Sequence, residues 1–439
     1  MKKIITILIT LFCLTYFSST SQTWLAISGG LGVTTQSVKT IAVDPSGKIY
    51  AGGTFTGTYN YLAMWNGTSW TDLGAGFDGP VYSIGIKTAS DIYIGGAFTN
   101  AGGIPANNIV HYSGSNWSAL DSGFNGQVNC VYVTGAGDVY AGGQFTASGG
   151  TALNHVTKYS GGQWTTLGSG IGGVVNAIML SNSILYAGTE ILSGPVQKFE
   201  NNTWSPVAGI SNGKVYALAN FKNNLYAGGD FQIPYFAAAR WDGANWASIT
   251  TVFSPAHKIY SFLNKKDSIL YIGGNFTGVG IGSPNYIGKI DGLINSPVKK
   301  FTTSSDLSGG EVYAIGNLNG KVIAGGKFTS PANNIAITST TVSVDEINNI
   351  IIEKCFFPNP AVGKAMLRIT TTEKIKNPEL KIFDLQSRLI KNIPVGKNIN
   401  LNKIEFVIDC NFLQSGNYYY MIKDEDKTIL TDKFVVIHE

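Results

Sequence analysis

Apolar and polar positions alternate in short runs, and the runs return at a regular spacing along most of the chain. The first run is Ile49-Tyr50-Ala51-Gly52-Gly53-Thr54-Phe55-Thr56, and later runs centre on Tyr93, Tyr140, Tyr186, Tyr226, Tyr271 and Ile323. A spacing of roughly 40 to 50 residues is typical of one four-stranded propeller blade. We therefore predict an all-β fold, a seven-bladed β-propeller whose sheets bury their apolar faces against one another.

Each repeat begins with an apolar residue of the predicted innermost strand. These residues are Val38, Val81, Val128, Val175, Val215, Ile259 and Val312. Two positions later lies a column of small residues, which comprises Thr40, Ser83, Cys130, Ala177, Ala217, Ser261 and Ala314. Small side chains fit the crowded strand nearest the axis. We therefore expect Cys130 to be a packing residue rather than a reactive thiol.

The predicted fourth strand of most repeats starts with tryptophan, at Trp70, Trp117, Trp164, Trp204 and Trp246. Turns such as Asn66-Gly67 and Asp242-Gly243 precede it, and both dipeptides are hairpin signals. We interpret the aromatic residues as packing between blades. The segment Trp24-Leu25-Ala26-Ile27 matches this column although it precedes the first repeat, and the last repeat lacks its own tryptophan. The N-terminal strand is therefore predicted to complete the last blade, which would leave no free sheet edge.

The Gly-Gly pair, an aromatic residue such as Trp65 twelve positions later and Trp70 five further resemble the kelch repeat and its secreted relatives. The resemblance covers residues 22–344. Two features depart from it: the Phe55-Thr56 pair that follows Gly-Gly, and the Asn-Gly turn before the tryptophan. The resemblance implies a propeller fold more than a function, because propellers host unrelated activities.

One face of the predicted propeller carries the loops that vary in length and content, which is where binding usually resides. Two variable columns are expected near that face. The candidate ligand-binding residues in them are Lys39, Tyr82, Asn129, Asn176, Tyr216, Tyr260, Tyr313, Glu190, Asp230 and Asn275. A ring of Tyr and Asn side chains can stack on a sugar and bind its hydroxyls. The alternative is that these residues pack between blades or contact water.

The net charge of +4 is spread over a chain with only 13% charged residues and 54 glycines, and it forms no basic stripe. Nucleic acid is therefore not predicted as a partner. The four histidines, which are His111, His155, His257 and His438, share no metal-ligand spacing. No cysteine cluster accompanies them, so neither a metal nor another cofactor is predicted.

No Ser/His/Asp arrangement has a recognisable local motif, and we predict no catalytic residues. His111 is interpreted as a solvated strand position, and Asp91, Asp138 and Asp267 as turn-forming residues. Glu190 and Asp230 occupy one column in adjacent blades. Such a pair could act as the acid and base of a glycosidase, which leaves an enzymatic alternative open.

The N-terminus has the pattern of a secretory signal peptide, predicted over residues 1–21. Met1-Lys2-Lys3 is basic, Ile4 to Phe17 is apolar, and Ser19-Thr20-Ser21 supplies small residues for cleavage. The apolar stretch is too short for a transmembrane anchor. An exported chain can keep disulfides, so a Cys355–Cys410 bridge is left open.

The repeat stops before a predicted linker, residues 345–349, and residues 350–439 have a different composition. Strand-like runs occur at Ala365–Thr371, Leu380–Phe383, Lys403–Ile408, Tyr418–Ile422 and Lys433–Ile437, with a turn predicted at Ser415–Asn417. Short strands at this spacing predict a small immunoglobulin-like β-sandwich.

Residues 350–439 also resemble the C-terminal sorting domain of the type IX secretion system of Bacteroidetes. The matching pieces are Phe357-Pro358-Asn359-Pro360, Leu380–Asp384 with Arg388-Leu389-Ile390, Leu413–Tyr419 with Gly416 and Tyr418, and Lys433–Val436. Ser387 stands where the family usually has glycine. The resemblance implies that the type IX machinery recognises the domain and that its sortase commonly removes it. The remainder is then released or attached to surface lipopolysaccharide. The alternative is an accessory adhesion domain.

These observations predict a secreted or surface-displayed, non-catalytic propeller that binds a glycan or protein ligand on its variable-loop face. A structural component of the cell surface or matrix is the first alternative. A polysaccharide-degrading enzyme is the second.

Overall fold

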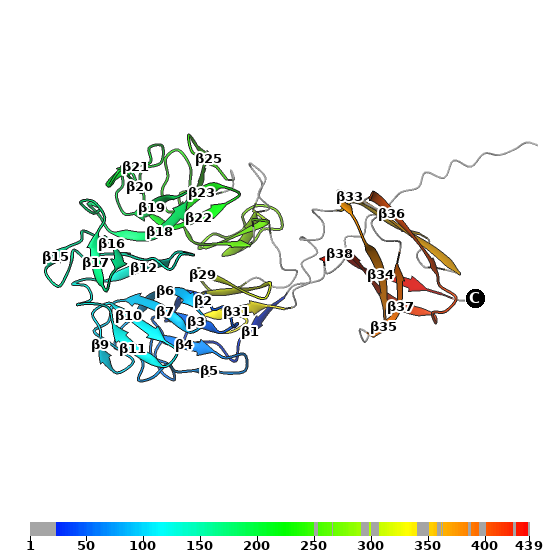
Figure 1. Cartoon of the computed structure of the whole chain (residues 1–439), viewed down its shortest axis with the longest axis horizontal. Coiled ribbons are helices and arrows are strands. Elements are labelled where there is room, and N and C mark those ends of the chain that lie inside the picture. Colours follow the sequence, from blue (N-terminus) through cyan, green and yellow to red (C-terminus); the bar gives the residue numbers. More distant parts are fainter. Residues whose placement is uncertain are drawn as a thin grey trace, which may run out of the picture. The chain divides into compact units, whose positions relative to one another are not determined.

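The computed structural model describes residues 23–249, 253–265, 267–290, 298–299, 307–339, 351–357, 361, 363–384, 388–394, 401–424 and 427–437. The predicted signal peptide, the linker, Pro358–Pro360 and His438 lie outside these ranges. Within them every regular element is a β-strand, which confirms the all-β prediction. Residues 21–341 form one compact unit, and residues 342–439 fall in a second (Figure 1).

The first unit repeats one four-stranded antiparallel sheet, hydrogen-bonded in chain order. The first copy consists of β2 (Val38–Val43), β3 (Ile49–Gly53), β4 (Leu62–Trp65) and β5 (Trp70–Thr71). The second has β6 (Val81–Thr88), β7 (Asp91–Gly96), β10 (Ile109–Ser113) and β11 (Asn116–Ala119). The third has β12 (Val128–Val133), β13 (Val139–Gly143), β16 (Val156–Ser160) and β17 (Gln163–Thr166). Two small hairpins, β8 (Asn100–Ala101) with β9 (Ile104–Pro105) and β14 (Ala147–Ser148) with β15 (Thr151–Ala152), project from loops.

The same order continues along the chain. The fourth sheet has β18 (Val175–Ser181), β19 (Ile184–Thr189), β20 (Val196–Glu200) and β21 (Thr203–Pro206). The fifth has β22 (Val215–Phe221), β23 (Asn224–Gly229), β24 (Ala238–Trp241) and β25 (Trp246–Ser248). The described part of the sixth has β26 (Ile259–Lys265), β27 (Ile269–Gly274) and β28 (Ile287–Ile290). The last combines β29 (Glu311–Leu318), β30 (Lys321–Lys327) and β31 (Ile335–Thr338) with β1 (Trp24–Ala26) from the N-terminus.

The N-terminal strand β1 pairs with the last repeat, as its sequence predicts. Trp24 lies opposite Thr338 and Ala26 lies opposite Ala336 in an antiparallel register. Trp24 is buried against the apolar residues of β29 and β30. The first strand of each sheet contacts the first strand of the next, and β29 also contacts β2. The sheets therefore have a propeller-like arrangement, with their first strands innermost (Figure 1).

The Gly-Gly pairs have two different physical causes. A side-chain methyl at Gly142, the first glycine of its pair, would lie 2.5 Å from Val175 Cγ1 of the following sheet. A methyl at Gly143, the second glycine, would lie 2.1 Å from the Gln127 carbonyl oxygen of its own sheet. The first glycine thus allows adjacent sheets to approach, and the second allows the innermost strand to lie against its neighbour.

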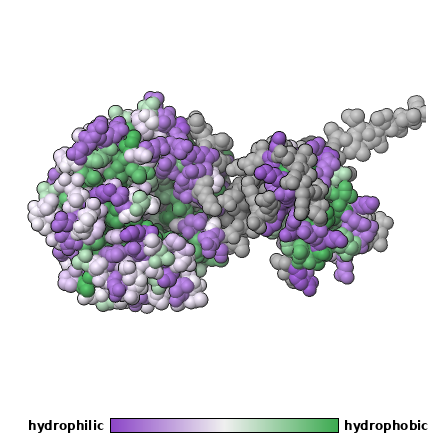
Figure 2. All heavy atoms as spheres, in the orientation of Figure 1, coloured by the Kyte–Doolittle hydropathy of each residue, from purple (hydrophilic) through white to green (hydrophobic). Residues whose placement is uncertain are grey.

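The aromatic residues pack within and between sheets, as predicted. Trp164 Nε1 donates a hydrogen bond to the Leu120 carbonyl of the preceding sheet at 3.2 Å. The phenylalanines that follow Gly-Gly are buried at Phe55, Phe98, Phe145, Phe276 and Phe328. These phenylalanines therefore fill the core under the loops. In the space-filling view, hydrophobic residues gather at the hollow where the sheets converge (Figure 2).

The second unit has two antiparallel sheets around one core. One sheet has β32 (Ile351–Phe357), β33 (Lys364–Ile375) and β36 (Leu401–Asp409). The other has β35 (Leu389–Pro394), β34 (Pro378–Phe383), β37 (Gly416–Asp424) and β38 (Lys427–Val436), in that order. Leu367 and Phe406 of the first sheet share a buried cluster with Leu380, Tyr420 and Phe434 of the second.

The five predicted strand runs of this unit are all present, and β32 and β35 are additional. The predicted turn at Ser415–Asn417 is wrong in part, because β37 already begins at Gly416. The Cys355–Cys410 bridge left open above is not formed. Cys410 is a free, buried thiol that packs in the core of the unit.

We predict that Gly142→Ala lowers the free energy of unfolding by about 1–3 kcal/mol, the usual cost of overpacking. The added methyl would meet Val175, Cys130 and Ile178 at 2.5 to 3.1 Å. Gly135→Ala is the matched control, because a methyl there has no neighbour within 4 Å. Urea unfolding measures both. Equal stability of the two variants would show that the close approach of sheets is not constraining.

Candidate functional site

A β-bulge interrupts the innermost strand of each three- or four-stranded sheet described in the first unit, at the second position of the strand or, in β29, at the third. The register shifts by one residue between Val38 and Thr40, and it does so at the matching place in the other sheets. The residues at the bulges, which we call the bulge column, are all half-buried. They are Lys39, Tyr82, Asn129, Asn176, Tyr216, Tyr260 and Tyr313. A bulge re-aims a side chain away from the pleat. The structure thus gives one variable column a common backbone geometry.

The variable loops lie at the same end of the sheets as the bulges. The link that enters each sheet is tied to the loop that follows its second strand. Asp78 Oδ1 accepts hydrogen bonds from the backbone N–H groups of Thr99 and Asn100 at 2.8 and 2.9 Å. Asn125 Oδ1 accepts the N–H of Thr146 at 2.9 Å in the next sheet. These side chains fix the loops that surround the bulge column.

Three of the candidate tyrosines and Lys39 pack on one another in sequence around the inner strands. The ring centroids of Tyr216 and Tyr260 are 5.5 Å apart, and those of Tyr260 and Tyr313 are 5.0 Å apart. Lys39 Nζ lies 3.3 Å from the Tyr313 ring centroid. This is the packing between sheets that the sequence left open as an alternative.

The hydroxyl groups of these tyrosines differ in their contacts. Tyr216 donates to Asp230 Oδ2 at 2.7 Å, and Tyr313 donates to the Glu311 carboxylate. Among the residues that the structure describes, we find no hydrogen-bond partner for the hydroxyls of Tyr82 and Tyr260. Those two hydroxyls can therefore take a ligand without breaking an existing contact.

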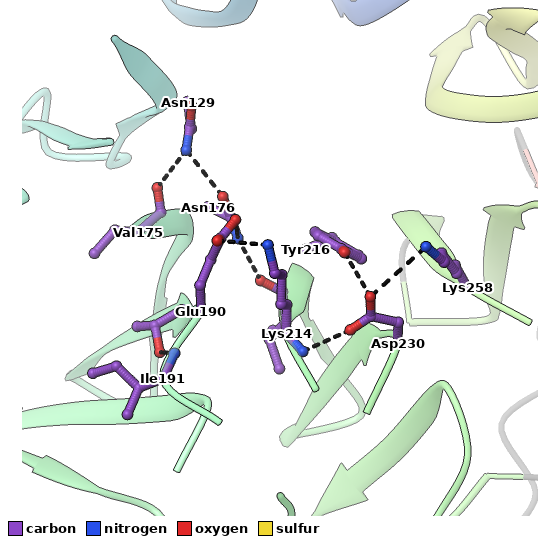
Figure 3. Close-up of polar contacts among 11 residues, drawn as sticks. Asn129, Val175, Asn176, Glu190, Ile191, Lys214, Tyr216, Asp230 and Lys258 are labelled. Carbon is purple, nitrogen blue, oxygen red and sulfur yellow. Dashed lines mark hydrogen bonds and ion pairs between the residues drawn. The ribbon is translucent and has the colours of Figure 1, made fainter. Parts of the chain in front are cut away.

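The two candidate asparagines connect neighbouring sheets. Asn129 Nδ2 donates to the Val175 carbonyl at 3.1 Å and to Asn176 Oδ1 at 2.9 Å. Asn176 Nδ2 donates in turn to the Val215 carbonyl at 3.3 Å. Asn129 and Asn176 therefore stabilise the sheet-to-sheet contacts (Figure 3).

Glu190, Lys214, Asp230 and Lys258 form a row of alternating charge, which we call the charged row (Figure 3). Lys214 Nζ lies 2.6 Å from Glu190 Oε2, and the Lys214 backbone N–H donates to Asp230 Oδ1 at 2.6 Å. Lys258 Nζ lies 3.8 Å from Asp230 Oδ2. The row brings together the two carboxylates named from the sequence. It also includes two lysines that sequence reasoning missed, because they precede the first strand of their sheets.

Asn275 connects the loop after β27 to the link that enters β26. Its Oδ1 accepts the Lys258 backbone N–H at 2.6 Å, and its Nδ2 donates to the Ala256 carbonyl at 3.3 Å. Asp230 makes the equivalent bond to Lys214 one sheet earlier. The residue after Gly-Gly thus caps the link that enters the innermost strand.

Burial shifts the pKa values of Lys39 and of the tyrosines in the bulge column. It lowers the pKa of Lys39 to about 8, with Glu311 opposing and Lys327 adding to the effect. Burial also raises the pKa of Tyr216, and the hydrogen bond to Asp230 raises it further. It raises the pKa of Tyr260 and Tyr313 as well. The tyrosines are therefore neutral hydroxyl groups at physiological pH.

The interpretation of His111 as a solvated position is wrong. Its ring stacks on Tyr93 at 4.6 Å between centroids, and Nε2 lies 2.6 Å from Asp91 Oδ1. Its Nδ1 lies 3.3 Å from Ser118 Oγ. Asp91 therefore opens β7 and holds His111 rather than forming a turn.

These three residues resemble a hydrolytic arrangement, yet the next sheet has a matching row without histidine. Lys158 Nζ lies 3.0 Å from Asp138 Oδ1, and Thr165 lies opposite Lys158 in the register. Lys158 and Asp138 occupy the positions of His111 and Asp91. The row in the second sheet is thus a cross-strand polar contact in which histidine replaces lysine.

In the second unit, Asp384 and Tyr418 of the sorting-domain motifs make hydrogen bonds to residues close by in the chain. Asp384 is nearly buried and accepts hydrogen bonds from the Arg388 N–H and Nε at 2.9 and 2.6 Å. Tyr418 Oη donates to the Gln414 carbonyl at 3.0 Å. Phe357 ends β32, and Lys433 lies opposite Tyr419 in β38.

Residues 355–437 match the family model of the secretion system C-terminal sorting domain. The chain is therefore exported through the outer membrane and is secreted or attached to the cell surface. The domain implies handling by the type IX secretion machinery and its sortase. No protein with a curated description matches the sequence.

Solved structures resemble the chain only distantly. The computationally designed Ika8 protein is 13% identical with a TM-score of 0.45, covering 71% of this chain and 99% of its own. The BBS1N domain in complex with ARL6DN is 11% identical with a TM-score of 0.41, covering 73% and 97%. Trypanosoma rangeli sialidase in complex with sialic acid is 8% identical with a TM-score of 0.31, covering 96% and 89%.

Within the described ranges, no helix is long and apolar enough to cross a membrane. Across the same ranges, no group of three or more His, Cys, Asp or Glu side chains is placed to hold a metal ion.

We predict that the unfolding free energy of the chain rises between about pH 8 and 9.5 relative to Lys39→Met. The folded state releases the Lys39 proton near pH 8, whereas the unfolded state keeps it to a pKa near 10.5. Because the unfolded state then binds more protons, stability rises with pH, by at most about 1.4 kcal/mol per unit for one proton. Urea unfolding at each pH measures the slope. The exposed Lys87→Met variant is the control and should keep the wild-type slope. Equal slopes for wild type and Lys39→Met would contradict the prediction.

Proposed function

We propose that this chain is a secreted or surface-attached, non-catalytic propeller that binds a glycan or protein ligand on its variable-loop face. In this proposal residues 22–344 form seven blades in a ring closed by β1. Residues 345–349 link the ring to a sorting domain of immunoglobulin-like type at residues 350–439. The contact of β29 with β2 and the pairing of β1 with β31 support the closed ring.

The bulge column is the observation that carries the proposal. A bulge disrupts ladder pairing and is usually retained where a side chain must be re-aimed. Here it recurs in the innermost strand of sheet after sheet, at the one position of that strand where Tyr, Asn and Lys alternate. Tyr82 and Tyr260 bring hydroxyls without a described partner to the end of the sheets where the loops vary. A rigid frame with variable polar groups is the usual design of a binding face.

A structural component of the cell surface is the second candidate. The packing of Tyr216, Tyr260 and Tyr313 on one another favours it, because those ring faces are already used. This candidate expects no saturable binding, and it expects an altered cell surface when the chain is absent.

For export, we propose that the type IX sortase removes the sorting domain and that the propeller is released or attached to surface lipopolysaccharide. We expect a chain that lacks residues 350–439 to stay in the periplasm, because the matched sorting domain is missing. Immunoblots of periplasm, membrane and medium measure this. Protease resistance of the retained protein would show that it still folds. Full recovery of the truncated chain in the medium would contradict the assignment.

For binding, we expect Tyr82→Phe combined with Tyr260→Phe to weaken ligand binding about tenfold, the effect of losing two hydrogen bonds of about 0.5–1.5 kcal/mol each. Tyr132→Phe, in the same kind of strand but outside the bulge column, is the control and should bind as wild type. A glycan array followed by titration of its hits, with thermal unfolding in parallel, measures both. A saturable hit with unchanged affinity in the double variant would remove the bulge column from the site. An array without hits would favour the structural component.

A further inference from the structure

An open depression of about 280 Å³ lies beside the charged row, between the fourth, fifth and sixth sheets. We call it the rim depression. It is lined by Leu192, Asn212, Lys214, Asp230, Gln232, Pro255 and Lys258. Leu192 and Gln232 come from loops after second strands, and Asn212 comes from the link that enters β22. The depression therefore belongs to the variable-loop face of the proposed function.

The two lysines and Asp230 that line the rim depression are balanced in charge once Glu190, the ion-pair partner of Lys214, is included. Lys214 contacts Glu190 at 2.6 Å, and Lys258 is nearest to Asp230 at 3.8 Å. Each ammonium group therefore has a carboxylate partner, which offsets part of its attraction for an anionic ligand. A ligand with a net charge gains little here, whereas a neutral polar ligand meets donors and acceptors of both kinds.

The side-chain amides of Asn212 and Gln232 lie at the rim depression. Within the described ranges, neither amide makes a hydrogen bond to the protein. Each amide offers two donor hydrogens and one acceptor oxygen. Their backbones are fixed, because the Asn212 N–H donates to the Leu192 carbonyl at 2.8 Å and the Gln232 N–H donates to the Ser211 carbonyl at 3.3 Å. The loops thus place two neutral amide groups, each of which can both donate and accept hydrogen bonds, at the rim depression.

Apolar surface lies next to these amides. Leu192 is 56% exposed although it is a large aliphatic residue. Pro255 lines the same depression and is also exposed. A pyranose ring has a face of C–H groups and an edge of hydroxyls that both donate and accept. The combination of an aliphatic platform, free amides and balanced charge matches that chemistry better than it matches an extended peptide or an anion.

We propose that the rim depression binds one or two residues of an uncharged sugar chain. The C–H face of the sugar lies on Leu192 and Pro255, and its hydroxyls bind the Asn212 and Gln232 amides. Asp230 already accepts hydrogen bonds from the Lys214 backbone N–H and the Tyr216 hydroxyl and lies 3.8 Å from Lys258 Nζ, so it orients Tyr216 and Lys258 at the floor of the site. The volume of about 280 Å³ lies just below the usual range of ligand sites, about 300–1,000 Å³, which suits a ligand of one or two sugar residues. This inference rests on the proposed function, because it names the ligand class of the same face.

The test titrates the full exported chain with neutral hexasaccharides of glucose, mannose and xylose, and with hexagalacturonate as the charged counterpart, by calorimetry. Asn212→Gly and Gln232→Leu remove the amides, and glycine keeps the positive φ of 60° at residue 212. Gln144→Leu is the control, an exposed glutamine of the third sheet that stands directly after a Gly-Gly pair, whereas Gln232 stands three positions after one. We expect one neutral sugar to bind with equal affinity at low and high salt. Either amide variant should bind it at least tenfold more weakly, and Gln144→Leu should bind within twofold of wild type.

Three results would overturn the inference. Binding of hexagalacturonate alone, with loss of affinity in salt, would show that the charged row attracts anions. A neutral sugar bound equally by wild type and both amide variants would place the site elsewhere, while the proposed binding function would stand. Binding of no saccharide, with capture of a defined surface protein that depends on Tyr82 and Tyr260, would also keep the proposed function and overturn the sugar assignment.

Discussion

The close approach of each sheet to the next is the constraint on which the first unit depends. Where Gly142 faces Val175, the two sheets are so close that a single methyl group would overlap the valine. The last and first sheets show the same contact, since a methyl at Gly325 would lie 2.6 Å from Val38 Cγ1. A sheet that buries both faces in this way cannot shift alone. Small residues such as Ala177 consequently pack in the buried cluster that the fourth and fifth sheets share.

The same constraint explains why the candidate site lies at one end of the sheets. The second glycine of each pair lies against the carbonyl of the entering link, as Gly53 does against Ser37. The innermost strand accommodates that contact with a bulge, which gives residues such as Tyr82 and Tyr260 a different direction from their neighbours. Capping side chains, for example Asp230 on Lys214, then fix the loops around them. Packing of the sheets and presentation of the variable residues therefore have one structural origin.

The charged row and the rim depression depend on residues that no single repeat contains. Glu190 belongs to the fourth sheet, Lys214 and Asp230 to the fifth, and Lys258 to the link that enters the sixth. Each lysine lies next to a carboxylate only because adjacent sheets are stacked. The sorting domain, in contrast, has local causes, because Asp384 and Arg388 close their own hairpin within five residues of chain.

The sequence by itself determined the repeat, the sheets, the pairing of Trp24 with the last repeat, and the sorting domain. Those features follow from periodic burial and from short motifs, and both can be recognised in the order of the residues along the chain. The bulges had one sequence signal, the three-residue step from Val38 to Ile41 where strict alternation requires two. Only the tertiary structure decided which tyrosines pack and which hydroxyls remain open, that His111 contacts Asp91, and that Lys214 and Lys258 join the candidate site. These contacts join side chains from different strands and sheets, and their distances depend on register and stacking, which no local pattern encodes.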